Sequence, residues 1–249
     1  MKERKNIYFL SDFHLGVDAK ETSLEREKKI VRFLQSIEDK AERVFLLGDV
    51  FDFWFEYKRV VPKGFVRLFG QLVKMTDMGI KIDFFCGNHD LWQRDYFSKE
   101  MNITVHREKV EEFLFDGKVF LVGHGDGLDK KDYMYRIIRF LFKNSFCNLI
   151  FSSIPANIGL WLANTWSSMS RHSHGKSDFE QNENEPMIEF CKNCLKQRKI
   201  DYFVFGHRHL VMQEDLSDGK ARYFNTGSWL YESSYLVWDG KNAEMKSFD

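Results

Sequence analysis

The sequence predicts an α/β fold in which a mixed β-sheet, or two sheets packed together, is flanked by helices. The first half of the chain alternates apolar, strand-like runs with amphipathic helical stretches, which is the order of parallel βαβ units. The last part contains short apolar runs separated by Asp-Gly pairs, which are typical of hairpin turns. With 249 residues, the chain is long enough for one large domain or for one domain with an insertion.

The expected elements follow from apolar runs for strands and from apolar residues at helical spacing for helices. In the first half we expect strands at 6–12, 43–49, 81–86, 103–106, 110–115 and 119–123, and helices at 23–41 and 65–78. Later we expect a helix over 185–198, a strand over 201–205 and short strands beside Asp218-Gly219 and Asp239-Gly240. Asp116-Gly117 predicts a hairpin turn, and Gly79 predicts the end of the second helix.

Composition limits the classes of function and the cellular location. Lys and Arg number 37, as do Asp and Glu, so no global field attracts nucleic acid and any site for a polyanion must be local. The first residues lead directly into a strand without an apolar signal segment, so we expect a cytoplasmic protein. The four cysteines lack disulfide-framework spacing, and the single Cys-X-X-Cys at 191–194 has no second pair for zinc, so we expect reduced thiols.

A small polar cluster follows each strand that is expected to be central. The clusters are Ser11-Asp12-Phe13-His14, Gly48-Asp49, Gly87-Asn88-His89-Asp90, Gly123-His124-Gly125-Asp126 and Gly206-His207-Arg208-His209. Each cluster alone is a weak signal, and a lone Gly-Asp is more often a turn than a ligand. Gly-Asn-His-Asp is rarer, and all five clusters in order form a strong signal. Because ligands bind at the carboxyl ends of strands in α/β sheets, we expect the clusters to converge. His106, His172 and His174 lie outside them and are interpreted as ordinary histidines.

The clusters contain seven candidate metal ligands, which are Asp12, His14, Asp49, Asn88, His124, His207 and His209. This mixture of imidazole and oxygen donors suits Mn²⁺, Fe or Zn²⁺ better than Ca²⁺ or Mg²⁺ alone. Seven ligands are too many for one ion, whereas two ions that share a bridging carboxylate would use them all. Two metals about 3.5–4 Å apart hold the attacking and leaving oxygens of a phosphoryl displacement.

In their order, these clusters resemble the calcineurin-like metallophosphoesterase superfamily, whose pattern is Asp-X-His, Gly-Asp, Gly-Asn-His, His and Gly-His-X-His. The resemblance covers nearly the whole chain and implies a four-layer sandwich with two packed mixed sheets between helices. It implies one ion held by Asp12, His14, Asp49 and His209, and a second held by Asn88, His124, His207 and the shared Asp49. It also implies that a hydroxide bridging the ions attacks phosphorus. His89 would stabilise the transition-state charge or protonate the leaving oxygen, and Asp90 would orient His89.

Residues from Gly127 to about 185 are predicted to form a helical, aromatic insertion. An apolar stripe at helical spacing contains Met134, Ile137, Ile138, Leu141, Phe142, Leu149 and Ile150. A hairpin that covers core residues is the commoner explanation of such a stripe. The insertion, however, starts beside His124, and its basic helix with a wide apolar face suits a membrane surface or a lipid chain. Interspersed Arg, Lys and Asn residues exclude a transmembrane span.

The chain is further similar to the UDP-2,3-diacylglucosamine hydrolases, bacterial pyrophosphatases of lipid A synthesis. It carries the run from Gly48 to Trp54, the run from Leu128 to Arg136, then Pro155 and the Ser168–Lys176 run, in that family's order. This resemblance implies a core of residues 1–127 and 186–249 and a helical lid over 128–185. It implies substrate contacts by Asn88, His89, Asp132, Tyr135, Ser170, Arg171, Lys176 and His207.

The reaction implied by this resemblance is hydrolysis of UDP-2,3-diacylglucosamine to UMP and 2,3-diacylglucosamine 1-phosphate. The implied cofactors are two divalent ions, with Mn²⁺ preferred and Fe or Zn²⁺ as alternatives. The protein would contact the cytoplasmic face of the inner membrane peripherally. The sequence gives no indication of nucleic acid as a substrate or of an obligate protein partner.

Alternative functions remain open from the sequence. Many members of that family carry Arg where His89 stands, so another amphiphilic or nucleotide phosphodiester is a second candidate substrate. A nucleic-acid phosphodiesterase is disfavoured by the zero net charge and the aromatic insertion. A non-catalytic scaffold of the same fold usually lacks metal ligands, and none is missing here. A membrane or partner-binding module would explain the insertion equally well.

Overall fold

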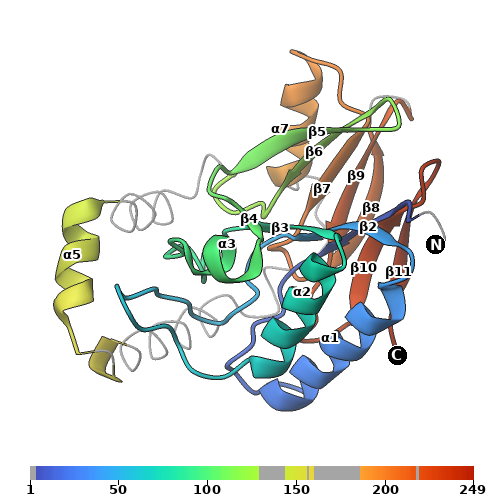
Figure 1. Cartoon of the computed structure of the whole chain (residues 1–249). Helices are drawn as coiled ribbons and strands as arrows, with labels where there is room; N and C mark the ends of the chain where they lie inside the picture. The colour runs from blue at the N-terminus through green and yellow to red at the C-terminus, as the bar shows by residue number, and fades with distance from the viewer. Residues whose placement is uncertain (1–3, 129–143, 156, 160–185, 217–218) are drawn as a thin grey trace.

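The computed structural model describes residues 4–128, 144–155, 157–159, 186–216 and 219–249. These residues form four layers, in which helices cover the outer faces of two packed sheets (Figure 1). Helices α1 (Ser23–Ile37) and α2 (Val66–Asp77) pack on one sheet, and α7 (Pro186–Leu195) packs on the other. The short α3 (Tyr96–Met101) lies beside α2, whereas α5 (Ser145–Ser153) lies apart from both sheets at the left of Figure 1. The predicted four-layer fold is confirmed.

The first sheet has six strands in the order β11-β10-β1-β2-β3-β4. They are β1 (Asn6–Leu10), β2 (Ala41–Leu46), β3 (Lys81–Phe85), β4 (Thr104–His106), β10 (Ser234–Trp238) and β11 (Ala243–Ser247). Strands β1 to β4 are parallel, and β10 and β11 continue the sheet with antiparallel pairing. The carboxyl ends of β1, β2 and β3 therefore meet at one edge, where a ligand site is expected.

The second sheet has five strands in the order β5-β6-β7-β9-β8. They are β5 (Val110–Phe115), β6 (Lys118–Gly123), β7 (Tyr202–Phe205), β8 (Val211–Leu216) and β9 (Ala221–Thr226). The three central strands β6, β7 and β9 are parallel, and β5 and β8 pair antiparallel with the outer two. The hairpin predicted at Asp116-Gly117 joins β5 to β6, where Phe115 pairs with Lys118.

Alternate residues of the central strands face two different cores. Tyr8 and Leu10 of β1 pack with the residues of α1 and α2, whereas Ile7 and Phe9 lie between the two sheets. Phe9 stacks against Phe120 of the second sheet with their ring centroids 6.0 Å apart. A strand that is apolar on both faces is what a sheet buried on both sides requires.

The two helices on the first sheet are tied to each other by side-chain caps. Thr22 and Glu25 form a capping box at the start of α1. The Glu27 side chain accepts hydrogen bonds from the backbone N–H groups of Arg67 and Leu68 at 2.9 and 3.1 Å. A residue of α1 therefore supplies the N-terminal cap that α2 lacks in its own sequence.

Several predicted boundaries were wrong. The helix expected at 23–41 ends at Ile37, because Ala41 already begins β2 and pairs with Asn6. The strands expected to reach residues 12 and 49 end at Leu10 and Leu46, and the residues beyond them form loops. The helix expected to reach residue 198 ends at Leu195. Helix α3 was not predicted, since a six-residue helix shows little periodicity.

Candidate metal centre

The five polar clusters meet at the carboxyl ends of the parallel strands of both sheets. Their loops are joined by backbone hydrogen bonds rather than by side-chain contact alone. The Asp12 N–H donates to the Gly48 carbonyl at 3.1 Å, and the His14 N–H donates to the Asp49 carbonyl at 2.9 Å. The loops after β1 and β2 are therefore joined into one unit that carries three predicted ligands.

All seven predicted ligands come together in this structure. Asp12, His14, Asp49 and His209 form one group whose ligand atoms all lie within 4.8 Å of one another. Asp49, His124 and His207 form a second group by the same measure. Asn88 lies beside the second group, with its Oδ1 3.2 Å from His124 Nε2. Asp49 belongs to both groups, which is the arrangement expected for a carboxylate between two ions.

The distances in the first group fit an ion better than a network of hydrogen bonds. Asp12 Oδ1 lies 3.0 Å from His209 Nε2, and His14 Nε2 lies 3.0 Å from the same nitrogen. Asp12 Oδ1 is nevertheless buried and accepts no hydrogen bond of good geometry. A buried oxygen without a hydrogen bond is costly unless another ligand satisfies it. These residues therefore fit a cation.

In the second group, the tautomer of one histidine is fixed by its outer contact. His124 Nδ1 lies 2.7 Å from the Leu47 carbonyl oxygen. Because a carbonyl only accepts, Nδ1 must donate, and the lone pair of the neutral ring lies on Nε2. Nε2 is 3.3 Å from Asp49 Oδ2. The backbone just after β2 thus prepares His124 to act as a ligand through Nε2.

Five of the seven predicted ligands have a left-handed backbone conformation. Their φ angles are positive, at 55° for Asp12, 44° for His14, 51° for Asp49, 70° for His207 and 53° for His209. Such angles cost non-glycine residues about 1–3 kcal/mol each and persist only where the surroundings enforce them. Their concentration at this edge indicates a functional site rather than ordinary turns.

Two glycines allow the loops to approach each other closely. A Cβ at Gly48, whose φ is +94°, would lie 2.7 Å from the Gly87 nitrogen and 2.8 Å from His124 Nδ1. A Cβ at Gly87 would collide with the Asp49 carboxylate. Glycine is therefore required by contact at both positions and by conformation at Gly48.

Comparison with known proteins identifies the family to which this site belongs. Residues 5–211 match the family of calcineurin-like phosphoesterases. The chain belongs to this family. It is 35% identical to the UDP-2,3-diacylglucosamine hydrolase of Porphyromonas gingivalis, over 99% of this chain and 98% of that protein. It is 28% identical to the protein of the same name from Haemophilus influenzae, over 82% of this chain and 83% of that protein.

Among solved structures, an archaeal phosphodiesterase has the same fold. Its TM-score to this phosphoesterase is 0.50 at 13% sequence identity, and the match covers 98% of this chain and 99% of that chain. This likeness confirms the expected architecture. The family match covers all of the strands that carry the predicted ligands.

Asp52 is a further residue of the phosphoesterase site that the sequence analysis did not single out. Its Oδ1 lies 3.5 Å from His14 Nδ1, and its carbonyl oxygen lies 2.8 Å from His89 Nδ1. These three residues also lie close enough together to form a third possible cation group. We interpret Asp52 as the outer partner of His14, since His14 Nε2 already faces the first group. The sequence feature that could have pointed to Asp52 is its position three residues after the predicted ligand Asp49.

Arg26 is a second residue that sequence reasoning missed. It is fully buried, although it lies on the helix that covers the first sheet. Its guanidinium donates to the carbonyl oxygens of Phe13, His14 and Val17 at 2.7, 2.8 and 2.6 Å. Arg26 therefore fixes the loop after β1, which carries the predicted ligands Asp12 and His14. No local motif indicated this, because the contacts join α1 to a loop that precedes it.

The two central carboxylates are charged despite their burial. Burial alone would raise the pKa of Asp12, but the charge of His209 and the nearby rings of His14 and His209 hold it well below its usual value. Burial likewise opposes ionisation of Asp49, whose pKa is lowered mainly by the charge of His124. Two ionised carboxylates in a buried cluster attract positive charge to the space between them.

The histidines respond to these carboxylates in two ways. Burial lowers the pKa of His14, but the nearby carboxylates of Asp12 and Asp52 raise it to about 9. The charge of Asp49 similarly raises the pKa of His124 well above its usual value against the effect of burial. Burial and the charge of His124 instead lower the pKa of His207 to about 3. His207 is thus a neutral imidazole, the form that binds a metal.

Asp90 fastens two loops of the site. Its Oδ1 accepts a hydrogen bond from the Gly87 N–H at 2.7 Å, and its Oδ2 accepts one from the Val50 N–H at 2.9 Å. Burial, together with the charge of Asp49, raises the pKa of Asp90 to about 7. Asp90 is thus attached to the turn that carries His89. Its direct orientation of His89 remains a prediction.

Five of the predicted substrate contacts belong to the predicted lid. Asp132, Tyr135, Ser170, Arg171 and Lys176 lie outside the described residues. Their roles, and the boundaries 128–185 of the lid, remain predictions. The remaining predicted substrate contacts, Asn88, His89 and His207, are all half-buried at the rim of the site.

Proposed function

We propose that this chain hydrolyses the pyrophosphate bond of UDP-2,3-diacylglucosamine and releases UMP and 2,3-diacylglucosamine 1-phosphate. The observation that carries this proposal is the 35% identity, along almost the whole of both chains, to a protein named UDP-2,3-diacylglucosamine hydrolase. The convergence of two ligand groups on Asp49 supplies the chemistry that such a hydrolysis requires.

The proposed cofactors are two divalent cations, with Mn²⁺ as the preferred ion and Fe or Zn²⁺ as alternatives. Asp12, His14, Asp49 and His209 would hold one ion, and Asp49, Asn88, His124 and His207 the other. When bound, two such ions neutralise phosphate oxygens and lower the pKa of a water nucleophile. The donor set of four histidines with carboxylate and amide oxygens suits these metals.

His89 is the proposed residue for charge or proton transfer at the leaving oxygen. Its Nδ1 donates to the Asp52 carbonyl at 2.8 Å, so Nε2 is the nitrogen that takes up and releases a proton. Burial lowers the pKa of His89 against the raising effect of the Asp49 charge. The His14 ring lies edge to face with it at 4.9 Å between centroids, which limits its rotation. The backbone of the loop after β2 thus holds this imidazole at the edge of the site.

The insertion over 128–185 is proposed to act as a lid that binds the two acyl chains. Phe151 of α5 packs against Phe55 and Trp92, with ring centroids 4.7 and 4.6 Å apart. Phe55 and Trp92 lie on the loops that follow Asp49 and Asp90, so the described part of the insertion touches both loops of the site. This aromatic contact gives an apolar side to the metal centre.

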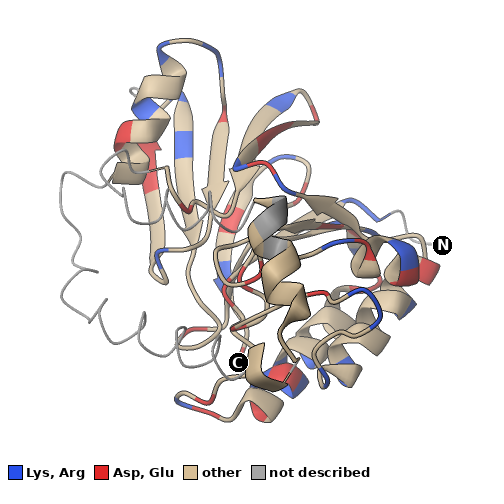
Figure 2. Ribbon diagram, turned by 90° about the vertical axis from the view of Figure 1, so that its left-hand side faces the viewer, with Lys and Arg blue, Asp and Glu red and all other residues tan. Residues whose placement is uncertain are grey.

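The same insertion is proposed to contact the cytoplasmic face of the inner membrane. Leu149, Ile150 and Ile158 are 63%, 52% and 51% exposed, and α5 contains no charged residue. Figure 2, in which α5 faces the viewer, shows this helix in front of the molecule without any blue or red residue. Such a surface suits insertion into the lipid headgroup region. Within the described residues, no helix combines the length and the apolar character needed to cross a bilayer.

Incubation of purified protein with UDP-2,3-diacylglucosamine and Mn²⁺ tests the proposed reaction. We expect equal amounts of UMP and 2,3-diacylglucosamine 1-phosphate, and loss of both when a chelator is present. His89→Ala should lower turnover by about 10²–10⁴-fold, the range for a general acid, while both metal ions stay bound. Faster hydrolysis of a simple phosphodiester than of the lipid substrate would favour the alternative substrate class. Loss of metal from the variant would show that His89 has another role.

Flotation with vesicles that contain anionic lipid tests the proposed membrane contact. Leu149→Glu together with Ile150→Glu should abolish flotation, because both side chains would place charge in the headgroup region. Leu114→Glu is the matched control, since Leu114 is 70% exposed but lies on β5 of the second sheet and not on α5. Equal loss of binding in the control would contradict a specific role of α5.

A further inference from the structure

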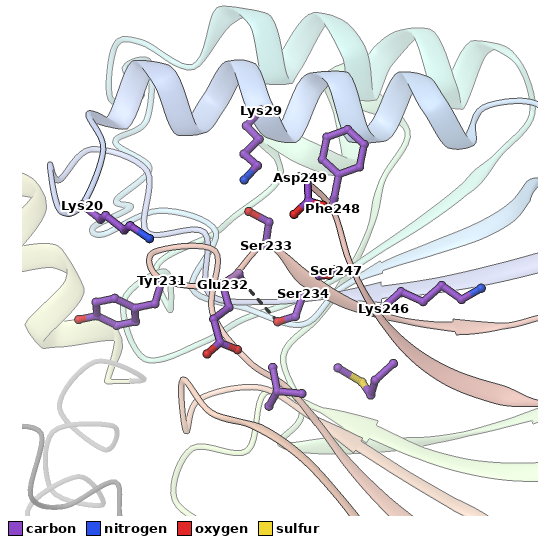
Figure 3. Close-up of a pocket in the computed structure, with 12 residues that line it drawn as sticks. Lys20, Lys29, Tyr231, Glu232, Ser233, Ser234, Lys246, Ser247, Phe248 and Asp249 are labelled. Carbon is purple, nitrogen blue, oxygen red and sulfur yellow. Dashed lines mark hydrogen bonds between the residues drawn. The ribbon is translucent and has the colours of Figure 1, made fainter.

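A cavity of about 640 Å³ lies between α1, the loop that joins β9 to β10, and β11 (Figure 3). None of its lining residues is a proposed metal ligand. The β9–β10 loop is nevertheless attached to the metal centre, because the Trp229 N–H and the Ser228 hydroxyl both donate to the Asp12 carbonyl at 3.1 Å. Two residues further along this loop, Tyr231 lines the cavity.

The cavity adjoins one of the exposed sides of the metal centre. The side chain of His209 is 18% exposed, whereas those of Asp12 and His14 are 0% and 1% exposed. The Tyr231 ring lies next to His209, with 6.4 Å between the ring centroids. A molecule that occupies the metal centre can therefore extend past His209 towards Tyr231.

The order of strands places this cavity opposite the apolar side of the site. In the first sheet, β10 lies on one side of β1, and β2 and β3 lie on the other. Tyr231 precedes β10, whereas Phe55 and Trp92, which contact α5, follow β2 and β3. A substrate with a lipid end and a polar end would thus direct the two ends to opposite sides of Asp12.

The chemistry of the cavity suits a nucleotide. Tyr231 is 59% exposed and offers an aromatic face. Lys20 and Lys29 line the same cavity, and neither has an ion-pair partner among the residues that the structure describes. Lys246, by contrast, lies 2.9 Å from Glu244. A base can stack on the ring, phosphate charge can attract the amines, and the Glu232 carboxylate in the cavity can accept from a base or ribose donor.

We infer that this cavity binds the nucleotide end of the substrate, with the pyrimidine base on Tyr231 and with Lys20 and Lys29 providing positive charge beside it. The inference rests on the proposed function, which supplies a substrate that carries a nucleotide and a lipid on one pyrophosphate. It adds to that function a specificity site outside the metal ligands and outside the insertion.

Binding of UMP, compared with ribose 5-phosphate, tests this inference in the Mn²⁺-loaded protein. Tyr231→Ala should weaken UMP binding by at least about fivefold, the smallest loss expected when a base loses an aromatic platform. It should leave ribose 5-phosphate, which has no base, unchanged. Tyr231→Phe should bind UMP as the unaltered protein does. Isothermal titration calorimetry measures all of these affinities.

Two neighbouring lysines of α1 provide a matched pair for the charge. Lys29→Ala should weaken UMP binding by about two- to fivefold, and the loss should shrink at high salt. Lys28→Ala should have no effect, because Lys28 is exposed and does not line the cavity. Equal effects of the two variants would contradict the inference.

The inference and the proposed function fail in distinguishable ways. If UMP is released from UDP-2,3-diacylglucosamine but Tyr231→Ala binds UMP as tightly as before, the cavity assignment is wrong and the function stands. If no UMP is released, the function is wrong, and the calorimetric comparison still decides whether the cavity binds a nucleotide. Equal losses of UMP and ribose 5-phosphate in Tyr231→Ala would indicate damage to the metal centre and would also overturn the inference.

Discussion

Among the residues that the structure describes, two clusters place histidine between carboxylates, and one of these two has the composition of a metal site. At the edge where the sheets meet, His106 lies 2.8 Å from both Asp83 Oδ1 and Glu111 Oε2. Arg43 Nε lies 2.9 Å from Asp83 Oδ2, as an ion pair whose N–H is not aligned with the oxygen. Within the described residues, Asp12 and Asp49 form ion pairs with histidines alone.

This difference shows what distinguishes a metal centre from a structural ion-pair network. Arg43 supplies a permanent positive charge to the His106 cluster, so its carboxylates are balanced by the protein itself. The carboxylates of the metal centre depend on protons or on divalent cations for the same purpose. Both clusters contain histidines and carboxylates, so these residue types do not distinguish them. The Arg43 guanidinium beside Asp83 does.

The largest expected effect comes from Asp49, which belongs to both ligand groups. Asp49→Asn keeps the shape of the side chain but removes the charge that two ions would share. We expect turnover to fall by more than about a thousandfold and the bound metal to fall below two equivalents. Metal analysis and initial rates measure this. His106→Gln should retain both metals and normal turnover, and a comparable loss there would remove the distinction between the clusters.

Metal removal should lower the free energy of unfolding, and this effect should depend on the cluster around Asp49 and not on the cluster around His106. At 100 times its dissociation constant, a bound ion stabilises the folded state by about 2.7 kcal/mol. We therefore expect Mn²⁺ to raise the midpoint of chemical unfolding and a chelator to reverse the effect. His106→Gln should show the same increase as the unaltered protein, and Asp49→Asn a smaller one. An unfolding midpoint that does not respond to Mn²⁺ would be inconsistent with a metal site in the described cluster.

Asp52 should affect metal affinity without being a ligand. Asp52→Asn removes the charge next to His14 Nδ1, and loss of such an outer partner typically weakens metal binding by about 10–100-fold. Competition with a coloured chelator measures this affinity. Asp39→Asn, at an exposed position after α1, is the control and should bind metal normally. Unchanged metal affinity in Asp52→Asn would contradict this role and would show that Asp52 is not needed to orient His14.

The smallest effect is expected at His106, and it depends on pH. Burial lowers the pKa of His106, but Asp83 and Glu111 raise it above its ordinary value. Because the pKa of His106 is higher in the folded than in the unfolded protein, protonated His106 stabilises the folded state. This contribution is complete below the unfolded-state pKa near 6.5 and is lost as the pH rises through the folded-state pKa. His106→Gln should therefore destabilise by about 1 kcal/mol at pH 6, since Glu111 is partly exposed, and by less at pH 9. Urea unfolding at both pH values measures this, and a loss that grows with pH would contradict the assignment.

The sequence analysis predicted which side chains gather at this edge because each lies in a short polar motif just after a strand, and their role as metal ligands remains a prediction. Residues that act across the fold were not predictable in this way. Arg26 reaches the ligand loop from α1, and Asp52 reaches His14 only after the loop beyond β2 has turned. The end of α1 was missed because the local sequence continues to favour helix, whereas pairing of Ala41 with Asn6 decides where β2 starts.

Electron paramagnetic resonance of the protein titrated with Mn²⁺ tests the central claim, that Asp49 lies between two ions. Ions about 3.5–4 Å apart, as in two-metal hydrolases, are magnetically coupled. We predict a coupled signal that grows to two equivalents in the unaltered protein and is absent in Asp49→Asn. A single uncoupled Mn²⁺ at saturation would contradict the account.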